Sequence, residues 1–313
     1  MNTLSDALPN AAPEARTRAP AGPSHVRPLY WLLRRELWEN RSLYIAPLIV
    51  AALILFGFLI GAAHIPHHFP RHIGSNYIDQ TGQSAIADIP YSVAAVAIIL
   101  TGFIVGAFYC LGALHNERRD RSILFWKSMP VSDLATVASK AAVPLLVLPV
   151  VLFVVIMATQ LVLFVVDSLI LAPAGVPMAA LWAQWPFLPM LAVLAYGLIT
   201  AAIWYAPIWG WLLMVSAWAR RAPFLWAVLP PLAVCLVELL AFGTGYFGRM
   251  LTYRLGGAID AAFSNAPKGA VTVAFAQIDP VRFLTSVDMW LGLVVAAVFL
   301  AAAVWLRHSR DLT

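Results

Sequence analysis

"AAVPLLVLPVVLFVVIMATQLVLFVV", residues 141–166, is an apolar run without a charged side chain. A helix of about 20 apolar residues crosses the hydrocarbon core of a bilayer, so this run is long enough for one crossing. Inside a bilayer each backbone amide must find its partner within the protein, which favours a helix. The run therefore predicts a membrane-spanning helix.

Five further runs of the same kind flank it in a chain of 313 residues, of which 62% are hydrophobic and 11% charged. We expect an all-α polytopic membrane protein with six spans. The fourth run is long for one crossing and short for two, and it contains Pro207, so it predicts one tilted or kinked helix; a hairpin there would give seven spans. The predicted spans are residues 44–63, 91–114, 141–166, 188–219, 223–242 and 289–306.

The distribution of lysine and arginine predicts the orientation. With the N-terminus inside, the inner segments carry fifteen of these residues and the outer loops five. Inner loops are enriched in lysine and arginine, so we expect both termini in the cytoplasm. Residues 44–306 then form the transmembrane domain, and residues 307–313 form a cytoplasmic tail.

Two different segments precede the first span. Residues 1–26 are rich in alanine and proline and predict a disordered, solvated tail. In residues 27–43, Leu29, Leu33 and Leu37 recur at helical spacing between charged residues, which is typical of an amphipathic helix at the inner leaflet. A cytoplasmic extension of the first span is the alternative.

A dense group of charges, "ERRDRSILFWKSMP" at residues 117–130, separates the second span from the third. Ile123, Trp126 and Met129 fall on one face of a predicted short helix, which Pro130 ends. An apolar, aromatic knob within a charged rim is typical of a protein-docking patch. A solvated inner loop with a lipid-facing aromatic residue explains the same composition.

The segments "ERRDRSILFWKSMPVSDLATVASK" (117–140) and "YAPIWGWLLMVSAWARRAPFLWAVLPP" (205–231) resemble parts of permease subunits of bacterial ABC-2 type exporters. The order of elements is also similar: an amphipathic first helix, six spans, a charged helix after the second span and a long outer loop before the sixth. The resemblance implies a multi-pass protein of the bacterial inner membrane that exports an amphipathic or lipid-like compound or a peptide antibiotic.

The same resemblance implies partners. Two copies of an ABC ATPase subunit would bind ATP and magnesium beneath the membrane, and a second permease chain, identical or not, would complete the transporter within membrane lipids; no nucleic acid is expected. A coupling helix would fit the ATPase. Its expected contact residues are Glu117, Arg118, Arg119, Asp120, Arg121, Ile123, Phe125, Trp126, Lys127 and Met129.

The sequence itself favours a division of labour. It contains no G-x-x-x-x-G-K-[ST] phosphate-binding motif and no evident catalytic constellation, so we expect no enzyme activity and no cofactor in this chain. Two rival functions are a gradient-driven transporter or channel that uses Glu238, and a non-transporting membrane scaffold or sensor that recruits a cytoplasmic protein.

Polar residues inside the predicted spans are candidates for a transport pathway. Glu238 is the foremost one, because an ionisable group at membrane depth is costly and often functional. A structural carboxyl group bonded to a neighbouring helix is the alternative. Weaker candidates, for which packing is favoured, are Gln160, Tyr196, Thr200 and Tyr205.

Three further features give weaker predictions. Gly57 with Gly61, and Gly102 with Gly106, have a spacing that lets helices pack closely. The outer loop, residues 243–287, predicts short helices that cap the outer mouth. A metal site is not expected, although the outer loop after the first span holds four histidines as weak candidates: His64, His67, His68 and His72.

Overall fold

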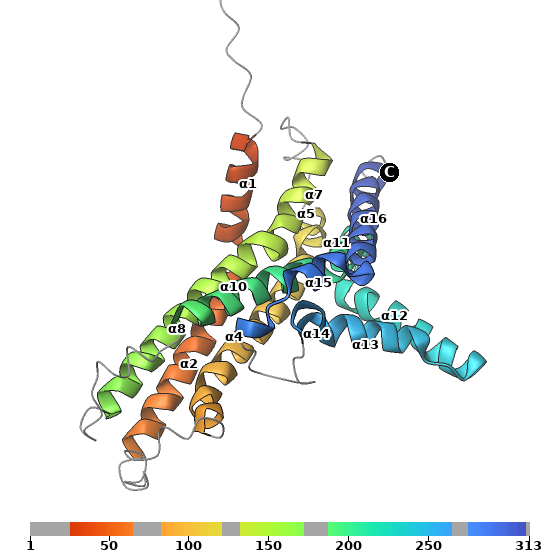
Figure 1. Cartoon of the computed structure of the whole chain (residues 1–313). Coiled ribbons are helices and arrows are strands. Elements are labelled where there is room, and N and C mark those ends of the chain that lie inside the picture. The colour runs from red at the N-terminus through yellow and green to blue at the C-terminus, as the bar shows by residue number, and fades with distance from the viewer. Residues whose placement is uncertain (1–25, 65–82, 121–131, 172–186, 265–274, 311–313) are drawn as a thin grey trace, which may run out of the picture.

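The computed structural model describes residues 26–64, 83–120, 132–171, 187–264 and 275–310. These residues form helices and no strand; one isolated antiparallel bridge joins Phe263 to Ile278. Figure 1 shows the arrangement. The helices are α1 (Val26–Glu39), α2 (Ser42–His64), α4 (Gln83–Ala113), α5 (His115–Arg119), α7 (Asp133–Ala142), the π-helix η2 (Val143–Val147), α8 (Leu148–Leu171), α10 (Phe187–Trp204), α11 (Ala206–Trp218), α12 (Pro223–Phe242), α13 (Tyr246–Gly256), α14 (Ala258–Ala262), the 3₁₀ helix η4 (Phe275–Gln277), α15 (Pro280–Thr285) and α16 (Val287–Arg310).

Among the described residues, six helical stretches are long and apolar enough to cross a membrane, which confirms the predicted all-α polytopic fold. The third stretch is continuous through α7, η2 and α8, and it therefore begins eight residues before the predicted span. The six stretches are Ser42–Gly61, Tyr91–Arg119, Asp133–Leu169, Phe187–Trp204, Pro223–Phe242 and Val287–Ser309.

The predicted fourth span is divided into two helices. α10 ends at Trp204, and Tyr205 leaves the helical conformation with φ −84° and ψ 1° before α11 begins. Pro207 lies in the first turn of α11, where its missing N–H group costs nothing, whereas in the middle of one long helix it would remove a hydrogen bond. The break therefore falls where the sequence predicted a kink.

The short helix α11 lies at the centre of the bundle. It packs most extensively against α16 and also against α4. Trp209 and Leu213 of α11 belong to the main buried cluster together with residues of α2, α4 and α8. Gly210 permits the approach to α16, because a Cβ atom there would lie 3.1 Å from the carbonyl oxygen of Ala296.

One of the two predicted glycine pairs lies at a packed helix contact. A Cβ atom at Gly102 or Gly106 would lie 2.6 Å from Leu152 or 2.8 Å from Leu148, so α4 and α8 touch through these positions. The other pair, Gly57 and Gly61 in α2, has no atom of another helix within 4 Å of its Cβ positions among the described residues. Of these two pairs, the one in α4 therefore lies at a close helix contact within the described part of the chain.

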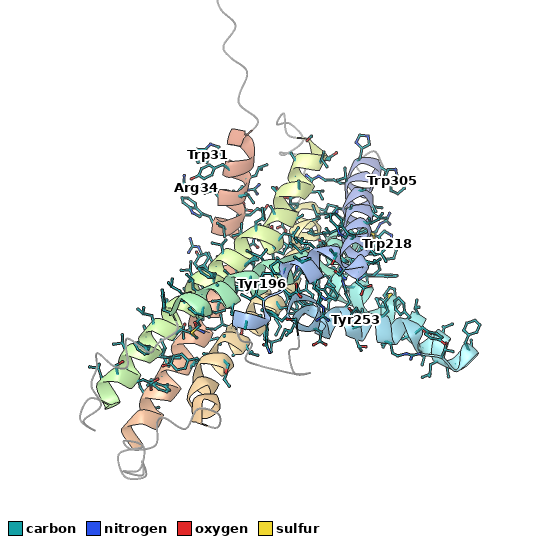
Figure 2. All side chains as sticks on the ribbon, viewed as in Figure 1. Trp31, Arg34, Tyr196, Trp218, Tyr253 and Trp305 are labelled. Atoms are coloured by element: carbon teal, nitrogen blue, oxygen red, sulfur yellow. The ribbon has the colours of Figure 1, made fainter. Side chains whose placement is uncertain are left out.

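Two elements extend away from the packed helices (Figure 1). α12 runs outward beside α13, and only 6% of its most apolar window is buried. α1 projects from the other side, where it contacts α7, and its Trp31 and Arg34 point away from the bundle (Figure 2). Such apolar surface in a membrane protein suits contact with lipid or with another chain.

Candidate functional site

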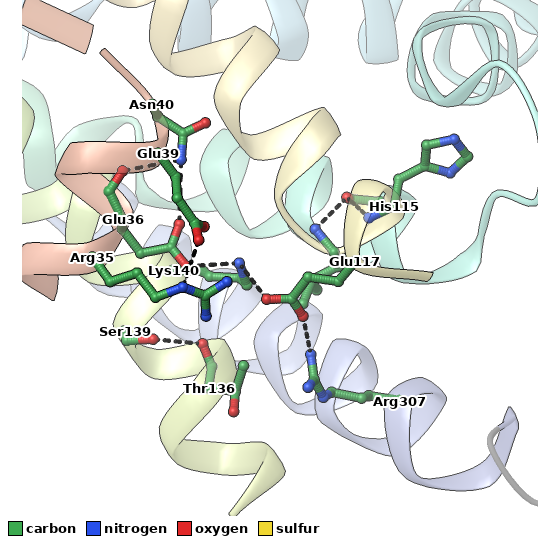
Figure 3. Close-up of polar contacts among 12 residues, drawn as sticks. Arg35, Glu36, Glu39, Asn40, His115, Glu117, Thr136, Ser139, Lys140 and Arg307 are labelled. Carbon is green, nitrogen blue, oxygen red and sulfur yellow. Dashed lines mark hydrogen bonds and ion pairs between the residues drawn. The ribbon is translucent and has the colours of Figure 1, made fainter. Parts of the chain in front are cut away.

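A buried ionic network joins four helices at one end of the bundle, where α1, α5, α7 and the last turns of α16 meet (Figure 3). We call this the charged end. The guanidinium of Arg307 in α16 contacts two carboxylates: Nη1 lies 2.8 Å from Glu117 Oε2, and Nε lies 2.9 Å from Asp133 Oδ1. Glu117 and Asp133 flank residues 121–131, so one side chain binds both flanks of that segment.

Lys140 extends the network to the first helix. Its Nζ lies 3.0 Å from Glu117 Oε1 and 2.8 Å from Glu36 Oε1, and only 3% of the Lys140 surface is exposed. Tyr109 of α4 donates its hydroxyl to Glu36 Oε2 at 2.9 Å. The five charges therefore form an unbroken chain in the order Glu36, Lys140, Glu117, Arg307 and Asp133.

The local sequence places these groups. Ser132 caps α7 by accepting a hydrogen bond from the Ala135 N–H group at 3.1 Å, which sets Asp133 in the first turn. Lys140 follows in the last turn, on the same buried side as Val137. A negative charge at the start of a helix and a positive one near its end both suit the helix dipole.

Ser216 of α11 holds the break between α4 and α5. Its hydroxyl oxygen accepts hydrogen bonds from the Leu114 and His115 N–H groups, both at 3.0 Å, and it donates to the Leu111 carbonyl at 2.8 Å. These bonds satisfy backbone groups at the junction of the two helices. The orientation of α5, and with it the position of Glu117, therefore depends on α11.

Each charge in this network is stabilised by partners of opposite charge. A buried ion that loses its partner typically costs about 3–5 kcal/mol, whereas an intact buried pair adds little net stability. Glu117 has two cationic partners and Arg307 has two carboxylate partners, so each charge is matched on more than one side. The arrangement fixes relative positions of helices more than it adds stability, and it can transmit a displacement of one helix to another.

The expected coupling residues divide into three groups. The Glu117 side chain is buried in the network, and Arg118 donates to the carbonyl oxygens of Ser216 and Ala219. These two side chains therefore make contacts within the chain, where the sequence predicted contacts with a partner. Arg119 and Asp120 are exposed. The remaining expected contacts, from Arg121 to Met129, lie outside the described residues, and α5 ends at Arg119.

Glu238 has a structural role in the turn between α12 and α13. Its carboxylate accepts hydrogen bonds from the N–H groups of Tyr246 and Phe247, at 2.6 and 2.8 Å, and from the Thr244 hydroxyl at 3.0 Å. These donors lie at the start of α13, where backbone N–H groups lack partners within the helix. Of the two predicted alternatives, the contacts match the structural carboxyl group.

The weaker pathway candidates make local or packing contacts, with one exception. Tyr196 donates to the Ala262 carbonyl and Tyr205 to the Leu255 carbonyl, both at 2.8 Å, which connects α10 to α14 and the break after α10 to α13. Thr200 donates to carbonyl oxygens of its own helix. Gln160 of α8 is the exception, because it is buried and its Oε1 atom has no hydrogen-bond partner.

A cluster that the sequence did not predict lies at the N-terminal end of α16, opposite the end that carries Arg307. Arg254 of α13 lies over the Trp204 ring at 4.3 Å and donates from Nη1 to the Asp288 carbonyl at 3.0 Å. Tyr253 donates its hydroxyl to Asp288 Oδ2 at 3.1 Å. Partial burial, then the bond to Asp288, raises the pKa of Tyr253, and burial lowers the pKa of Arg254.

The histidine candidates remain a prediction, since His67, His68 and His72 lie outside the described residues and the His64 side chain is not described either. Within the described ranges, no three His, Cys, Asp or Glu side chains gather as a metal site would require. Cys110 and Cys235 are both free thiols.

The fold thus defines a multi-pass, all-α membrane protein with a buried ionic network at one end. Comparisons with protein families, curated proteins and solved structures found no match to this chain. Its function has to be inferred from its own residues.

Proposed function

We propose that the chain is the permease subunit of an ABC-2 type exporter in a bacterial inner membrane. It would work with two copies of a separate ATPase subunit and a second permease chain, and it would export an amphipathic or lipid-like compound or a peptide antibiotic. The resemblance of residues 117–140 and 205–231 to such permeases motivates the proposal. In this proposal the N- and C-termini and the charged end face the cytoplasm, as the positive-inside rule predicts.

One observation supports it most directly: Arg307 binds both Glu117 and Asp133. A segment that receives force from an ATPase must be attached to the spans, or its movement would be lost in a flexible loop. Here residues 121–131 are bounded by two carboxylates on the same guanidinium of α16. A push on that segment would therefore act on the sixth span directly.

The network would also carry the displacement to the other helices. A displacement of Glu117 would move Lys140 at the start of the third span, and a displacement of Lys140 would move Glu36 of α1. Each link is a buried charge-assisted contact, so the helices move together or the contact breaks at considerable cost. ATP-driven closure of two ATPases would in this way tilt several spans at once.

The rival functions differ in what they require. A gradient-driven transporter would use Glu238 as its ion-binding group, but three donors already occupy its carboxylate. A scaffold or sensor would use the same charged end to recruit a protein, without transport. The presence of an ATPase gene beside this one would favour the exporter over both rivals.

Co-purification with that ATPase tests the docking assignment. The double variant Arg119→Glu with Trp126→Ala changes the exposed cation and the aromatic anchor of the proposed coupling helix. The control Arg249→Glu with Trp290→Ala makes the same chemical changes at exposed residues of α13 and α16. We expect the first variant to lose the ATPase and the control to retain it. Assembly and coupled ATP hydrolysis in both would refute the docking site.

A further inference from the structure

A basic cavity of about 550 Å³ lies at the charged end, between α5 and the turn that joins α11 to α12. Four arginines and a histidine contribute to its wall, and no carboxylate does so among the described residues. The lining residues are His115, Arg118, Arg119, Ala219, Arg220, Arg221 and Ala222.

Part of the wall is rigid. Arg118 donates to the carbonyl oxygen of Ala219 at 3.2 Å, and His115 Nδ1 lies 3.1 Å from the same oxygen. Both side chains therefore connect α5 to the end of α11. The cavity is a built feature of two packed elements, because its floor is held by these bonds.

The three remaining arginines of the cavity wall are exposed and can contact a ligand. Arg119, Arg220 and Arg221 are exposed, and within the described part of the chain none of them forms an ion pair. Like charges gathered at one cavity repel each other, and a bound anion removes that repulsion. Arginine forks match the oxygen geometry of phosphate, so a phosphate group is the anion that this wall suits best.

The backbone contributes to the same preference. Ala222 adopts the left-handed conformation with φ 47° and ends the turn, and Pro223 begins the 20-residue helix α12. The start of a helix carries partial positive charge, which favours a nearby anion. Since Ala222 is part of the cavity wall, this helix start borders the arginine cluster.

Exposed aromatic and apolar side chains border the cavity. Trp218 and Trp226, on either side of the turn, pack edge to face with ring centroids 4.6 Å apart (Figure 2 labels Trp218), and both are exposed. Tryptophan favours the level of lipid headgroups. Phe224 and Leu225, which directly follow the cavity wall, are more than half exposed and apolar. They offer a surface for acyl chains just beyond the arginines.

We propose that this cavity binds the phosphate of an anionic membrane phospholipid, with the headgroup among Arg119, Arg220 and Arg221 and the acyl chains along the start of α12. Basic pockets between membrane helices commonly hold such headgroups. The neighbouring apolar surface distinguishes a lipid from a soluble phosphate compound. The site does not depend on the proposed exporter function, since it requires only that the chain lies in a bilayer.

Lipid binding to the isolated, purified full chain tests the proposal. Native mass spectrometry would count phosphatidylglycerol and phosphatidylcholine retained from mixed micelles, with no ATPase present. The variant Arg220→Gln with Arg221→Gln removes two cavity cations but leaves Arg119 in place. The control Arg249→Gln with Arg282→Gln removes two exposed cations of the outer loop region.

We expect the wild-type chain and the control to prefer phosphatidylglycerol, and the cavity variant to bind it at least about tenfold more weakly, because each basic residue near a headgroup contributes appreciably. An Arg220→Lys with Arg221→Lys variant should retain most of the preference. A monodisperse elution profile of each variant shows that it is folded.

Three results would overturn the proposal. One is equal binding of phosphatidylglycerol and phosphatidylcholine by the wild-type chain, or an equal loss of phosphatidylglycerol binding in the cavity variant and in the control. Another is competition by inorganic pyrophosphate that removes the phosphatidylglycerol preference at millimolar concentration, which would identify a site for soluble phosphates. The third comes from a separate co-purification with the ATPase: a wild-type chain without lipid preference, together with a cavity variant that no longer binds the ATPase, would identify a protein contact.

Discussion

Arg307 Nη1 lies 2.8 Å from Glu117 Oε2, although the two residues are 190 positions apart in the sequence. The pair joins the last turn of the sixth span to the end of the second, and both side chains are buried. Glu117 also contacts Lys140, and Arg307 also contacts Asp133. Their contact is therefore the third of four links in the network, and its loss separates Glu36, Lys140 and Glu117 from Arg307 and Asp133.

Breaking the contact between Arg307 and Glu117 should lower the stability of the folded chain. We expect Arg307→Gln to lower the free energy of unfolding by about 1–3 kcal/mol, because Glu117 and Asp133 lose their shared cation while Glu117 keeps Lys140. Thermal or denaturant unfolding of the purified chain in detergent would measure the change. The exposed control Arg249→Gln should have little effect.

A double-mutant cycle with Glu117→Gln separates the pair from its surroundings. Since each single change already breaks the contact, the double variant should be less destabilised than the sum, by about 0.5–3 kcal/mol. Strictly additive effects would show that Arg307 and Glu117 do not interact in the folded chain.

Glu36 offers a second prediction, which concerns α1 alone. Glu36→Ala removes one of the two carboxylate partners of Lys140 Nζ and the acceptor of the Tyr109 hydroxyl, and these contacts fasten α1 to the bundle. We expect the free energy of opening α1 to fall by about 1–3 kcal/mol, while the spans stay folded. Hydrogen exchange followed by peptide mass spectrometry would locate the change.

Glu39→Ala is the matched control for this experiment. Glu39 lies one turn further along α1, is half exposed and pairs with Arg35 of the same helix. Surface pairs of this kind contribute little, so exchange in α1 should be close to that of the wild-type chain. If Glu36→Ala and Glu39→Ala change hydrogen exchange in α1 equally, Glu36 does not hold α1 against the bundle.

Much of the fold could be predicted from the sequence because the spans are local patterns. An apolar run such as residues 223–242 contains all the information that a bilayer-spanning helix needs, and α12 has these bounds. The charge network has no such local signature. Glu36, Glu117 and Arg307 come from three distant parts of the chain, and only the packing of α1, α5 and α16 brings them together.

A partial signal for the network was nevertheless present in the sequence. Lys140 directly precedes an apolar run, and Arg307 directly follows one. We interpreted both as positive-inside residues, which explains their charge but predicts solvent exposure. Carboxylates at the ends of neighbouring spans, here Glu117 and Asp133, are the feature that distinguishes a buried pair from a solvated loop.

The role of Glu238 as a helix cap gives a third prediction. Glu238→Ala removes the acceptor for the Tyr246 and Phe247 N–H groups, so the first turn of α13 should lose its protection and exchange hydrogen at rates near those of an open loop. Glu238→Gln should retain part of the protection, because its amide oxygen can accept one of these bonds. A gradient-driven transporter predicts the contrary: loss of ion dependence in both variants, with the turn intact.

Gly292 of α16 supports a fourth prediction, about the N-terminal part of α16. A Cβ atom at this position would lie 1.7 Å from Nη2 of Arg254, so an alanine and this guanidinium cannot occupy their places together. Gly292→Ala should displace Arg254 from the Trp204 ring and from the Asp288 carbonyl. We expect a loss of about 1–3 kcal/mol in the free energy of unfolding, although alanine is the better helix former.

Arg254→Ala should reverse the sign of the effect that Gly292→Ala has on the free energy of unfolding. In an Arg254→Ala background the space beside Gly292 is free, and Gly292→Ala should then be neutral or stabilise α16 by up to about 1 kcal/mol. The two unfolding measurements form a cycle whose sign depends only on the contact between this glycine and this arginine. A Gly292→Ala variant that is equally destabilised with and without Arg254 would place the guanidinium elsewhere and remove it as the link between α13 and α16.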